Sequence, residues 1–322
     1  MTPPISRQLN SKITELEFPD PSLSKSNLEA AATRIAEQGS AQISVEDLFE
    51  LAKECVSQGL YAQRDALYNC IKSDTRTTKE QYNTVAINDG MKLRREGQYD
   101  TALETLEAIA PHSDPETEWT RCKEISLCQF YIWEQGERID SAMIQKSVQT
   151  AQAILDSDFY EELPAAVHIE VIHLVAGNML EGNFPVETIE PFVRLYENAV
   201  HEVEKQTPVP HHQAGLAWIK GGVAHKKEEF NAAINHYTEA IKLNEVIGHK
   251  FPPTIQALLV LDKMEQLDER QKALQSTLTD FIEKETPGLA HDLAPQLKIQ
   301  LEELAKAYPQ LAGTISARLK ES

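Results

Sequence analysis

Two pairs of histidines lie close enough along the chain to be candidate metal ligands. Residues 168–173 read HIEVIH and are similar to the zinc motif H-E-x-x-H, in which both histidines share one face of a helix. Here His168 and His173 are five residues apart, which turns them about 140° from each other on a regular helix. One helix therefore cannot direct both imidazoles to one ion. His211 and His212 are adjacent, and we interpret them as an exposed loop pair. We predict no metal site and no cofactor.

Other reactive residue types do not stand in a catalytic pattern. The sequence contains no G-x-x-x-x-G-K-[ST], G-x-G-x-x-G or G-x-S-x-G motif. The paired carboxylates Glu161-Glu162 and Glu302-Glu303 are typical of solvated helix faces. We predict that the protein is not an enzyme. The alternative is a helical-repeat enzyme or a small-molecule-responsive regulator with a distributed site, because residues brought together only by folding leave no local motif.

The composition of the chain excludes several further classes of protein. The chain has 322 residues, 50 acidic and 31 basic side chains, a formal net charge of -19 and a mean hydropathy of -0.39. Such a surface repels nucleic acid and anionic membranes. No apolar run approaches the roughly 20 residues that span a bilayer, and the first ten residues have no apolar signal segment. The four cysteines form no C-x-x-C pair and are expected to stay reduced. We predict a cytoplasmic protein that binds neither nucleic acid nor membrane.

The elements that position these residues follow a repeated turn pattern. Five tetrapeptides recur between helix-like stretches: QGLY, EGQY, QGER, EGNF and KEEF, with second positions Gly59, Gly97, Gly136, Gly182 and Glu228. These positions follow each other at steps of 38, 39, 46 and 46 residues. Because glycine ends a helix readily in the left-handed conformation, each unit is predicted to be helix, tight turn, helix.

Apolar spacing and capping residues predict the helices around the turns. Ser44 and Thr78 stand before helical apolar patterns and can cap them. Second helices are expected over residues 100–109, 139–155, 186–203 and 230–246, and later helices over 254–264, 268–285 and 290–307, with a short last one ending at 322. No segment alternates apolar and polar residues as a strand does. We predict an all-α fold, an α-solenoid of about six or seven antiparallel helix hairpins.

Three regions are expected along the chain. Residues 1–25 contain four prolines and are predicted to form a flexible N-terminal arm, residues 26–250 the helical repeats, and residues 251–322 helices that cap the solenoid. The apolar positions of the last region would also suit a dimer interface. The proline-bearing stretch 204–212 is either a joint between two blocks or an ordinary inter-helix loop, the interpretation we adopt.

Two units resemble the tetratricopeptide repeat. The unit at Glu228 matches the family's small and large positions with Gly221, Phe230, Ala233, Tyr237, Ala240, Ile241 and Leu243. The unit at Gly97 matches with Ala86, Gly90, Tyr99, Ala102, Leu106 and Ile109. The unit at Gly59 matches in part, and those at Gly136 and Gly182 are degenerate. The resemblance covers roughly residues 44–250 and implies a right-handed superhelix whose first helices line a concave groove.

The resemblance also implies which residues face a partner. The family's groove positions correspond here to aromatic, apolar and basic side chains: Phe49, Lys53, Ile87, Met91, Arg94, Arg95, Lys123, Phe130, Trp133, Trp218, His225 and Lys226. Such a groove suits a peptide or partner protein with acidic and apolar side chains. The same residues could instead be core aromatics and basic helix ends that face the dipole. We predict a non-catalytic interaction scaffold or adaptor.

Members of the family that grip acidic chaperone tails carry an asparagine directly after the repeat glycine. In this chain Met91 follows Gly90, and Gly222 follows Gly221. The asparagine is missing from both well-matched units, so that carboxylate clamp is not expected.

Overall fold

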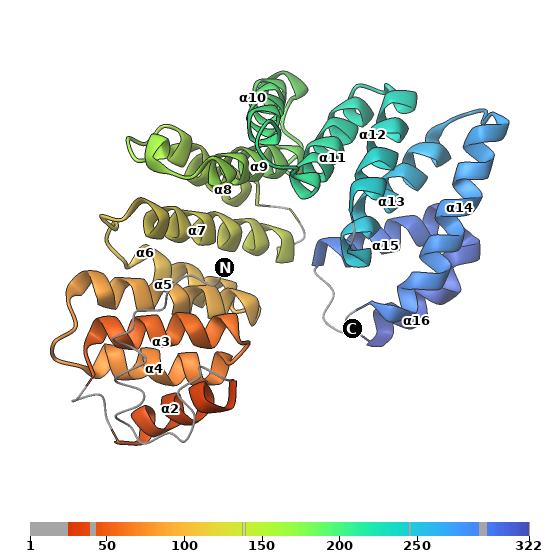
Figure 1. Ribbon diagram of the computed structural model, residues 1–322. Helices are drawn as coiled ribbons and strands as arrows, with labels where there is room; N and C mark the ends of the chain where they lie inside the picture. Colours follow the sequence, from red (N-terminus) through yellow and green to blue (C-terminus); the bar gives the residue numbers. More distant parts are fainter. Residues whose placement is uncertain are drawn as a thin grey trace. The chain divides into compact units, whose positions relative to one another are not determined.

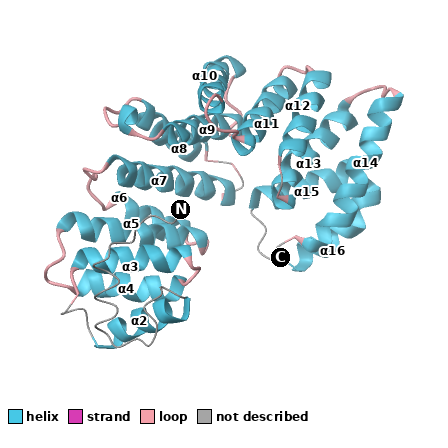
Figure 2. Cartoon of the chain, in the orientation of Figure 1, coloured by secondary structure: helices cyan, strands magenta, loops and turns pink. Residues whose placement is uncertain are grey.

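The computed structural model describes residues 25–38, 43–136, 138, 140–244, 246–289 and 295–321. Within these residues the chain forms fifteen α-helices, α2 to α16, and no strand (Figure 1, Figure 2). The all-α prediction is confirmed. The arm predicted for residues 1–25 lies outside the described residues except for Lys25, where α2 begins. Among the described helices, none combines the length and the apolar character that crossing a membrane requires.

The chain divides into two compact units, Met1–Glu118 and Trp119–Ser322. The described part of the first unit contains α2 (Lys25–Gln38), α3 (Val45–Ser57), α4 (Tyr61–Ser73), α5 (Lys79–Arg95), α6 (Tyr99–Glu107) and the first turn of α7 (Pro115–Gln135). In this unit α3 packs against α4, and α5 against α6. Buried apolar side chains such as Leu48, Leu67 and Ile71 form its core.

The second unit continues from α7 in the same manner. It contains α8 (Ser141–Leu155), α9 (Ala165–Glu181), α10 (Val186–Glu204), α11 (Pro210–Lys226), α12 (Phe230–Leu243), α13 (Ile247–Lys263), α14 (Glu269–Glu285), α15 (Pro295–Ala307) and α16 (Ala312–Glu321). Pairs of consecutive helices pack together, α9 with α10, α11 with α12, α13 with α14, and α15 with α16. In addition α9 packs on α11, so the first helices of neighbouring hairpins lie side by side. The expected α-solenoid of antiparallel helix hairpins is confirmed.

The capping residues act as the sequence predicts. The Ser44 side chain accepts a hydrogen bond from the amide of Asp47 at 3.1 Å at the start of α3. Thr78 and Gln81 form a reciprocal capping box at the start of α5. Pro210 is the first residue of α11, and the stretch 204–212 is an inter-helix loop with its flanking helix ends, inside the second unit.

α13 begins earlier than the sequence predicts. It starts at Ile247, before Pro252 and Pro253 rather than after them. Phe251 and Ile255 are fully buried in the core that α12 to α16 share. Their burial stabilises the first turns of the helix although two amides are missing, because tertiary packing outweighs local propensity. The boundary predicted at residue 250, between repeats and cap, consequently falls inside a helix.

Four hairpin turns use a left-handed residue two positions after the end of the first helix, and in the turn after α7 Arg138 is left-handed, with φ of 60°. Gly59 and Gly97 have φ angles of 72° and 78°, as expected for repeat glycines. In two later turns the left-handed residues are Asn183, with φ of 56°, and Glu228, with φ of 61°. Gly182 has φ of -72°, so its turn places the left-handed residue one position later than predicted. In each of the four turns the following amide donates to the carbonyl five residues earlier, which closes the helix end.

Small residues let paired helices approach closely where the repeat resemblance expects it. A Cβ placed on Gly90 of α5 would lie 2.6 Å from Leu106 of α6. A Cβ on Gly221 of α11 would lie 2.6 Å from the Tyr237 ring of α12. Both positions therefore fix the spacing within a hairpin.

Candidate functional site

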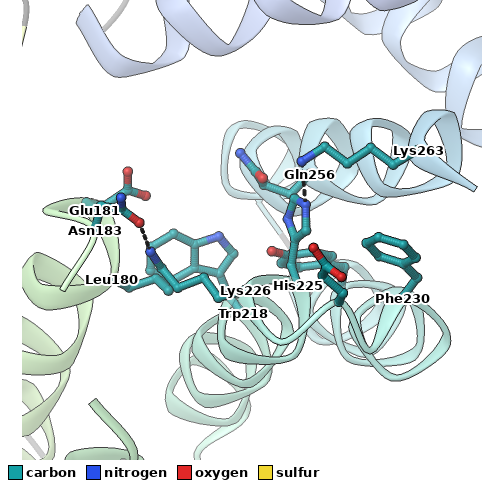
Figure 3. A pocket seen from close by; sticks show the side chains of 12 residues that line it. Leu180, Glu181, Asn183, Trp218, His225, Lys226, Phe230, Gln256 and Lys263 are labelled. Carbon is teal, nitrogen blue, oxygen red and sulfur yellow. Dashed lines mark hydrogen bonds between the residues drawn. The ribbon is translucent and has the colours of Figure 1, made fainter. Parts of the chain in front are cut away.

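The second unit holds a recess between α9, α11, α12 and α13, which we call the basic recess (Figure 3). Its volume is about 480 Å³. It is lined by Leu180, Glu181, Asn183, Trp218, Gly222, His225, Lys226, Glu228, Phe230, Tyr237, Gln256 and Lys263.

Helical spacing on α11 builds one wall of this recess. Trp218, Gly222, His225 and Lys226 occupy positions i, i+4, i+7 and i+8 and therefore share one face of the helix. Gly222 lets α11 approach α9, since a Cβ there would lie 2.4 Å from a methyl group of Leu180. The close approach brings the side chains of α11 next to the end of α9.

Two lysines reach into the basic recess and bond to uncharged acceptors. Lys226 donates to Oδ1 of Asn183. Lys263, from α13, donates to Nε2 of His225 with an N–N distance of 3.0 Å. Figure 3 shows both bonds, with the Trp218 indole beside Lys226. Lysines elsewhere commonly bond to carboxylates, as Lys220 does to Glu197 at 2.7 Å. The ammonium charges of Lys226 and Lys263 are thus not directly bonded to an anion.

Burial and mutual repulsion shift the ionisation of these groups. Burial, followed by the charges of Lys263 and Lys226, lowers the pKa of His225 to about 4. Burial also lowers the pKa of Lys226, although Glu181 opposes the change. His225 is therefore neutral at neutral pH, and its Nε2 accepts a hydrogen bond from the ammonium group of Lys263. Binding of an anion would favour the charged form of Lys226, whose pKa is lowered by burial.

A second recess lies between α7, α9, α10, α11 and α13, and we call it the histidine recess. Its volume is about 600 Å³. It is lined by Trp119, Lys123, Leu127, Glu170, His173, Leu174, Tyr196, His211, His212, Ala214, Gly215, Trp218, Asn244, His249, Pro252 and Pro253. Trp218 lines both recesses, so they adjoin through one side chain.

The two histidines of the HIEVIH segment have different surroundings. His168 bonds through Nε2 to the carbonyl oxygen of Tyr160 at 2.7 Å and stacks on the Tyr160 ring. His173 faces the histidine recess, between Tyr196 and Trp218. The two imidazoles therefore do not face a common metal position. In the described part of the chain no cluster of three or more His, Cys, Asp or Glu residues could hold a metal ion.

Four of the predicted groove residues lie in hydrophobic cores. Ile87, Phe130 and Trp133 are 2%, 7% and 5% exposed. Phe49 packs against the core of the first unit. Their side chains stabilise the hairpins and do not form an exposed wall, because core and groove positions occupy adjacent stripes of the same helix.

The other predicted residues of the first unit are more accessible. Lys53 is exposed and pairs with Glu50 at 2.8 Å. Met91 and Arg94 are half-buried, and Arg95 is exposed, in the last turns of α5. None of these four lines a recess described above.

The structure brings the remaining four predicted residues together. Trp218, His225 and Lys226 line the basic recess, and Lys123 and Trp218 line the histidine recess. Lys123 forms an ion pair with Glu170 at 3.0 Å and lies 5.4 Å from the centre of the Trp119 ring.

Several recess residues were not predicted from the sequence. Lys263, Gln256 and His249 all lie on α13, which the sequence assigns mainly to the capping region. No repeat position marks them, and only the packing of α13 beside α11 and α12 brings them to the recesses. The two histidine pairs were local signals for the histidine recess, since His173, His211 and His212 line it. His211 and His212 lie in the first turn of α11 and not in a loop as predicted.

A scan against protein-family models finds no match for the chain, and a search of curated proteins finds none. The tetratricopeptide resemblance therefore rests on residues of this chain and stays a prediction. Of its expected features, the close helix approach at Gly90 and Gly221 and the left-handed glycines at Gly59 and Gly97 are present.

Proposed function

We propose that this protein is a non-catalytic interaction scaffold that binds an acidic segment of a partner protein in the basic recess. The observation that carries the proposal is the convergence of Lys226 and Lys263 on one recess, both bonded to uncharged acceptors. Glu181 and Glu228 line the same recess, so the proposal rests on the two ammonium groups themselves and not on a net positive charge of the recess. Among the described residues neither ammonium group bonds to a carboxylate, so a carboxylate of the partner would supply that bond.

The apolar side chains of the basic recess indicate that the bound segment also carries an apolar side chain. Trp218 and Phe230 line it beside the lysines, so a segment that combines carboxylates with an apolar side chain fits both components. This agrees with the acidic and apolar partner that the repeat resemblance implies. None of the four cysteines, all of which the structure describes, forms a disulfide, which fits a cytoplasmic location.

Peptide selection on charge-reversed variants tests the proposal. Dodecapeptides are selected from a random library on the full chain, and their affinities are measured by fluorescence anisotropy. The Lys226→Glu/Lys263→Glu variant is compared with Lys205→Glu/Lys272→Glu. The control removes two exposed lysines that pair with neighbouring glutamates and makes the same change in net charge.

The selected peptides should be enriched in Asp and Glu. We expect the recess variant to weaken their binding about tenfold or more, and the control variant to change it less than twofold, at moderate salt. Affinity should also fall as salt rises from about 0.05 to 0.5 M, because partly exposed charges are screened. Selected peptides without acidic residues, or equal loss in both variants, would contradict the proposal.

A further inference from the structure

Ring side chains dominate the histidine recess. Five helices, α7, α9, α10, α11 and α13, contribute Trp119, His173, Tyr196, His211, His212, Trp218 and His249. The rings of His211 and His249 are 5.8 Å apart, and the rings of His173 and Tyr196 are 5.6 Å apart with an edge-to-face geometry. Such walls favour a flat aromatic group, which can stack on some rings and meet the edges of others.

The recess carries little net charge. Its two charged lining residues, Lys123 and Glu170, pair with each other at 3.0 Å. Burial, then the neighbouring His211 and His212, lowers the pKa of His173 to about 4. Burial and His211 lower the pKa of His212 as well. At neutral pH the imidazoles of His173 and His212 are therefore neutral, in contrast to the ammonium groups of the basic recess.

One imidazole also presents a hydrogen-bond donor. Nδ1 of His173 is buried without a hydrogen-bond partner, and a Cβ on Gly215 would lie 3.2 Å from it. An unpaired acceptor is tolerated better in such a place than an unpaired N–H. We therefore expect the neutral ring to carry its proton on Nε2, and His173 is one of the residues that line the recess.

We infer that the histidine recess is a second binding site, for a small, uncharged, planar heteroaromatic ligand whose acceptor atom takes a hydrogen bond from Nε2–H of His173. The volume of about 600 Å³ lies within the range typical of small-ligand sites and exceeds the size of one side chain. The inference goes beyond the proposed scaffold function, because it concerns a different recess and a different ligand class.

Ligand-observed NMR titration of the full chain tests the inference with quinoxaline as the probe. Naphthalene has the same shape without acceptor atoms, and quinoxaline-2-carboxylate adds a negative charge. The His211→Ala/His249→Ala variant removes two exposed rings from the recess. Its control, His201→Ala/His236→Ala, removes two histidines that lie on α10 and α12 and line neither recess.

We expect saturable one-to-one binding of quinoxaline, at least about fivefold weaker in His211→Ala/His249→Ala and unchanged in the control. His173→Phe should weaken quinoxaline about fivefold and leave naphthalene within twofold, since it removes one hydrogen bond and keeps the ring. Binding of the selected acidic peptides should not change in His211→Ala/His249→Ala, which separates this site from the basic recess.

Three outcomes would overturn the inference. The first is absence of saturable quinoxaline binding, or equal binding by the recess variant. The second is tighter binding of quinoxaline-2-carboxylate that Lys226→Glu/Lys263→Glu abolishes, which would place the aromatic ligand in the basic recess. The third is binding of N-acetyl-tryptophanamide in clear preference to quinoxaline, which would make the recess a subsite for a partner's aromatic side chain.

Discussion

Glu134, near the end of α7, has a carboxylate that is fully buried. Its oxygens make no hydrogen bond, and Nη2 of Arg138 lies 3.7 Å from one of them. The same guanidinium lies 3.5 Å from Glu181. The guanidinium of Arg138 therefore interacts with two carboxylates, those of Glu134 and Glu181. Burial, with Glu181 adding to it, raises the pKa of Glu134 to about 7, although Arg138 opposes the change.

The raised pKa of Glu134 makes the free energy of unfolding depend on pH. The folded state binds the Glu134 proton more tightly than the unfolded chain, whose ordinary value is 4.5. The stabilisation is complete below pH 4.5 and is lost as the pH rises through 7. We expect Glu134→Gln to raise the free energy of unfolding at pH 8 by about 1–3 kcal/mol, with little effect at pH 4.5.

Urea unfolding followed by tryptophan fluorescence measures this effect. All three tryptophans, Trp119, Trp133 and Trp218, belong to the second unit and report on the unit that contains Glu134. Glu303→Gln, on an exposed position of α15, serves as the control and should change nothing. A Glu134→Gln protein less stable than wild type at pH 8 would show that the carboxylate is needed as an anion by Arg138.

At the scale of elements, the turn after α11 contains a residue poorly suited to its backbone. Glu228 has φ of 61°, a conformation that glycine adopts without strain and a residue with a Cβ does not. We expect Glu228→Gly to stabilise the second unit by about 0.5–1 kcal/mol in urea unfolding. Glu228→Gln removes the same charge and keeps the Cβ, so it should give no gain. An equal gain in both variants would assign the effect to charge.

In the α11–α12 hairpin, close packing makes a glycine necessary at position 221. A Cβ on Gly221 would lie 2.6 Å from the buried Tyr237 ring, whereas one on Gly248 meets nothing within 4 Å. Gly221→Ala should destabilise the second unit by about 1–3 kcal/mol, because the ring must move. Gly248→Ala should be neutral or stabilise by up to about 1 kcal/mol through helix propensity. Thermal unfolding of both variants, with tryptophan fluorescence, compares them, and similar melting temperatures would contradict the packing argument.

The elements were predictable from the sequence where their signals are local. Ser44, Thr78, Gly59 and Gly97 act within a few residues of their own position, and the structure confirms each role. The start of α13 was not predictable, since the burial of Phe251 by distant helices decides it.

The candidate site was predictable only in part, for the same physical reason. Trp218, His225 and Lys226 share a helix face, and the repeat pattern identifies that face. Helical spacing does not distinguish Trp133, which is buried, from Trp218, which lines the recesses. Lys263 reaches His225 across 38 residues of sequence, through packing that no local motif encodes.

At the scale of the whole molecule, each unit contains hydrophobic core clusters of its own. Side chains of α2 to α5 form the core of the first unit. The second unit has its own cores, around α8 to α11 and around α12 to α16. Both recesses are lined only by residues of the second unit. We therefore expect the proposed binding to require the second unit and not the first.

We expect a fragment of residues 111–322 to fold by itself and to bind the selected acidic peptides within about twofold of the full chain, because it retains the cores around α8 to α11 and α12 to α16 and every recess residue. It begins before α7, so that the bonds from the amides of His112 and Thr117 to Glu118 and Asp114 are kept. Residues 1–110 serve as the matched fragment and should be helical but should not bind the peptides.

Circular dichroism establishes whether both fragments fold, and fluorescence anisotropy measures peptide binding. A well-folded 111–322 fragment with affinity reduced more than about tenfold would show that the first unit contributes contacts to the partner, and would restore Lys53, Arg94 and Arg95 as candidates for them.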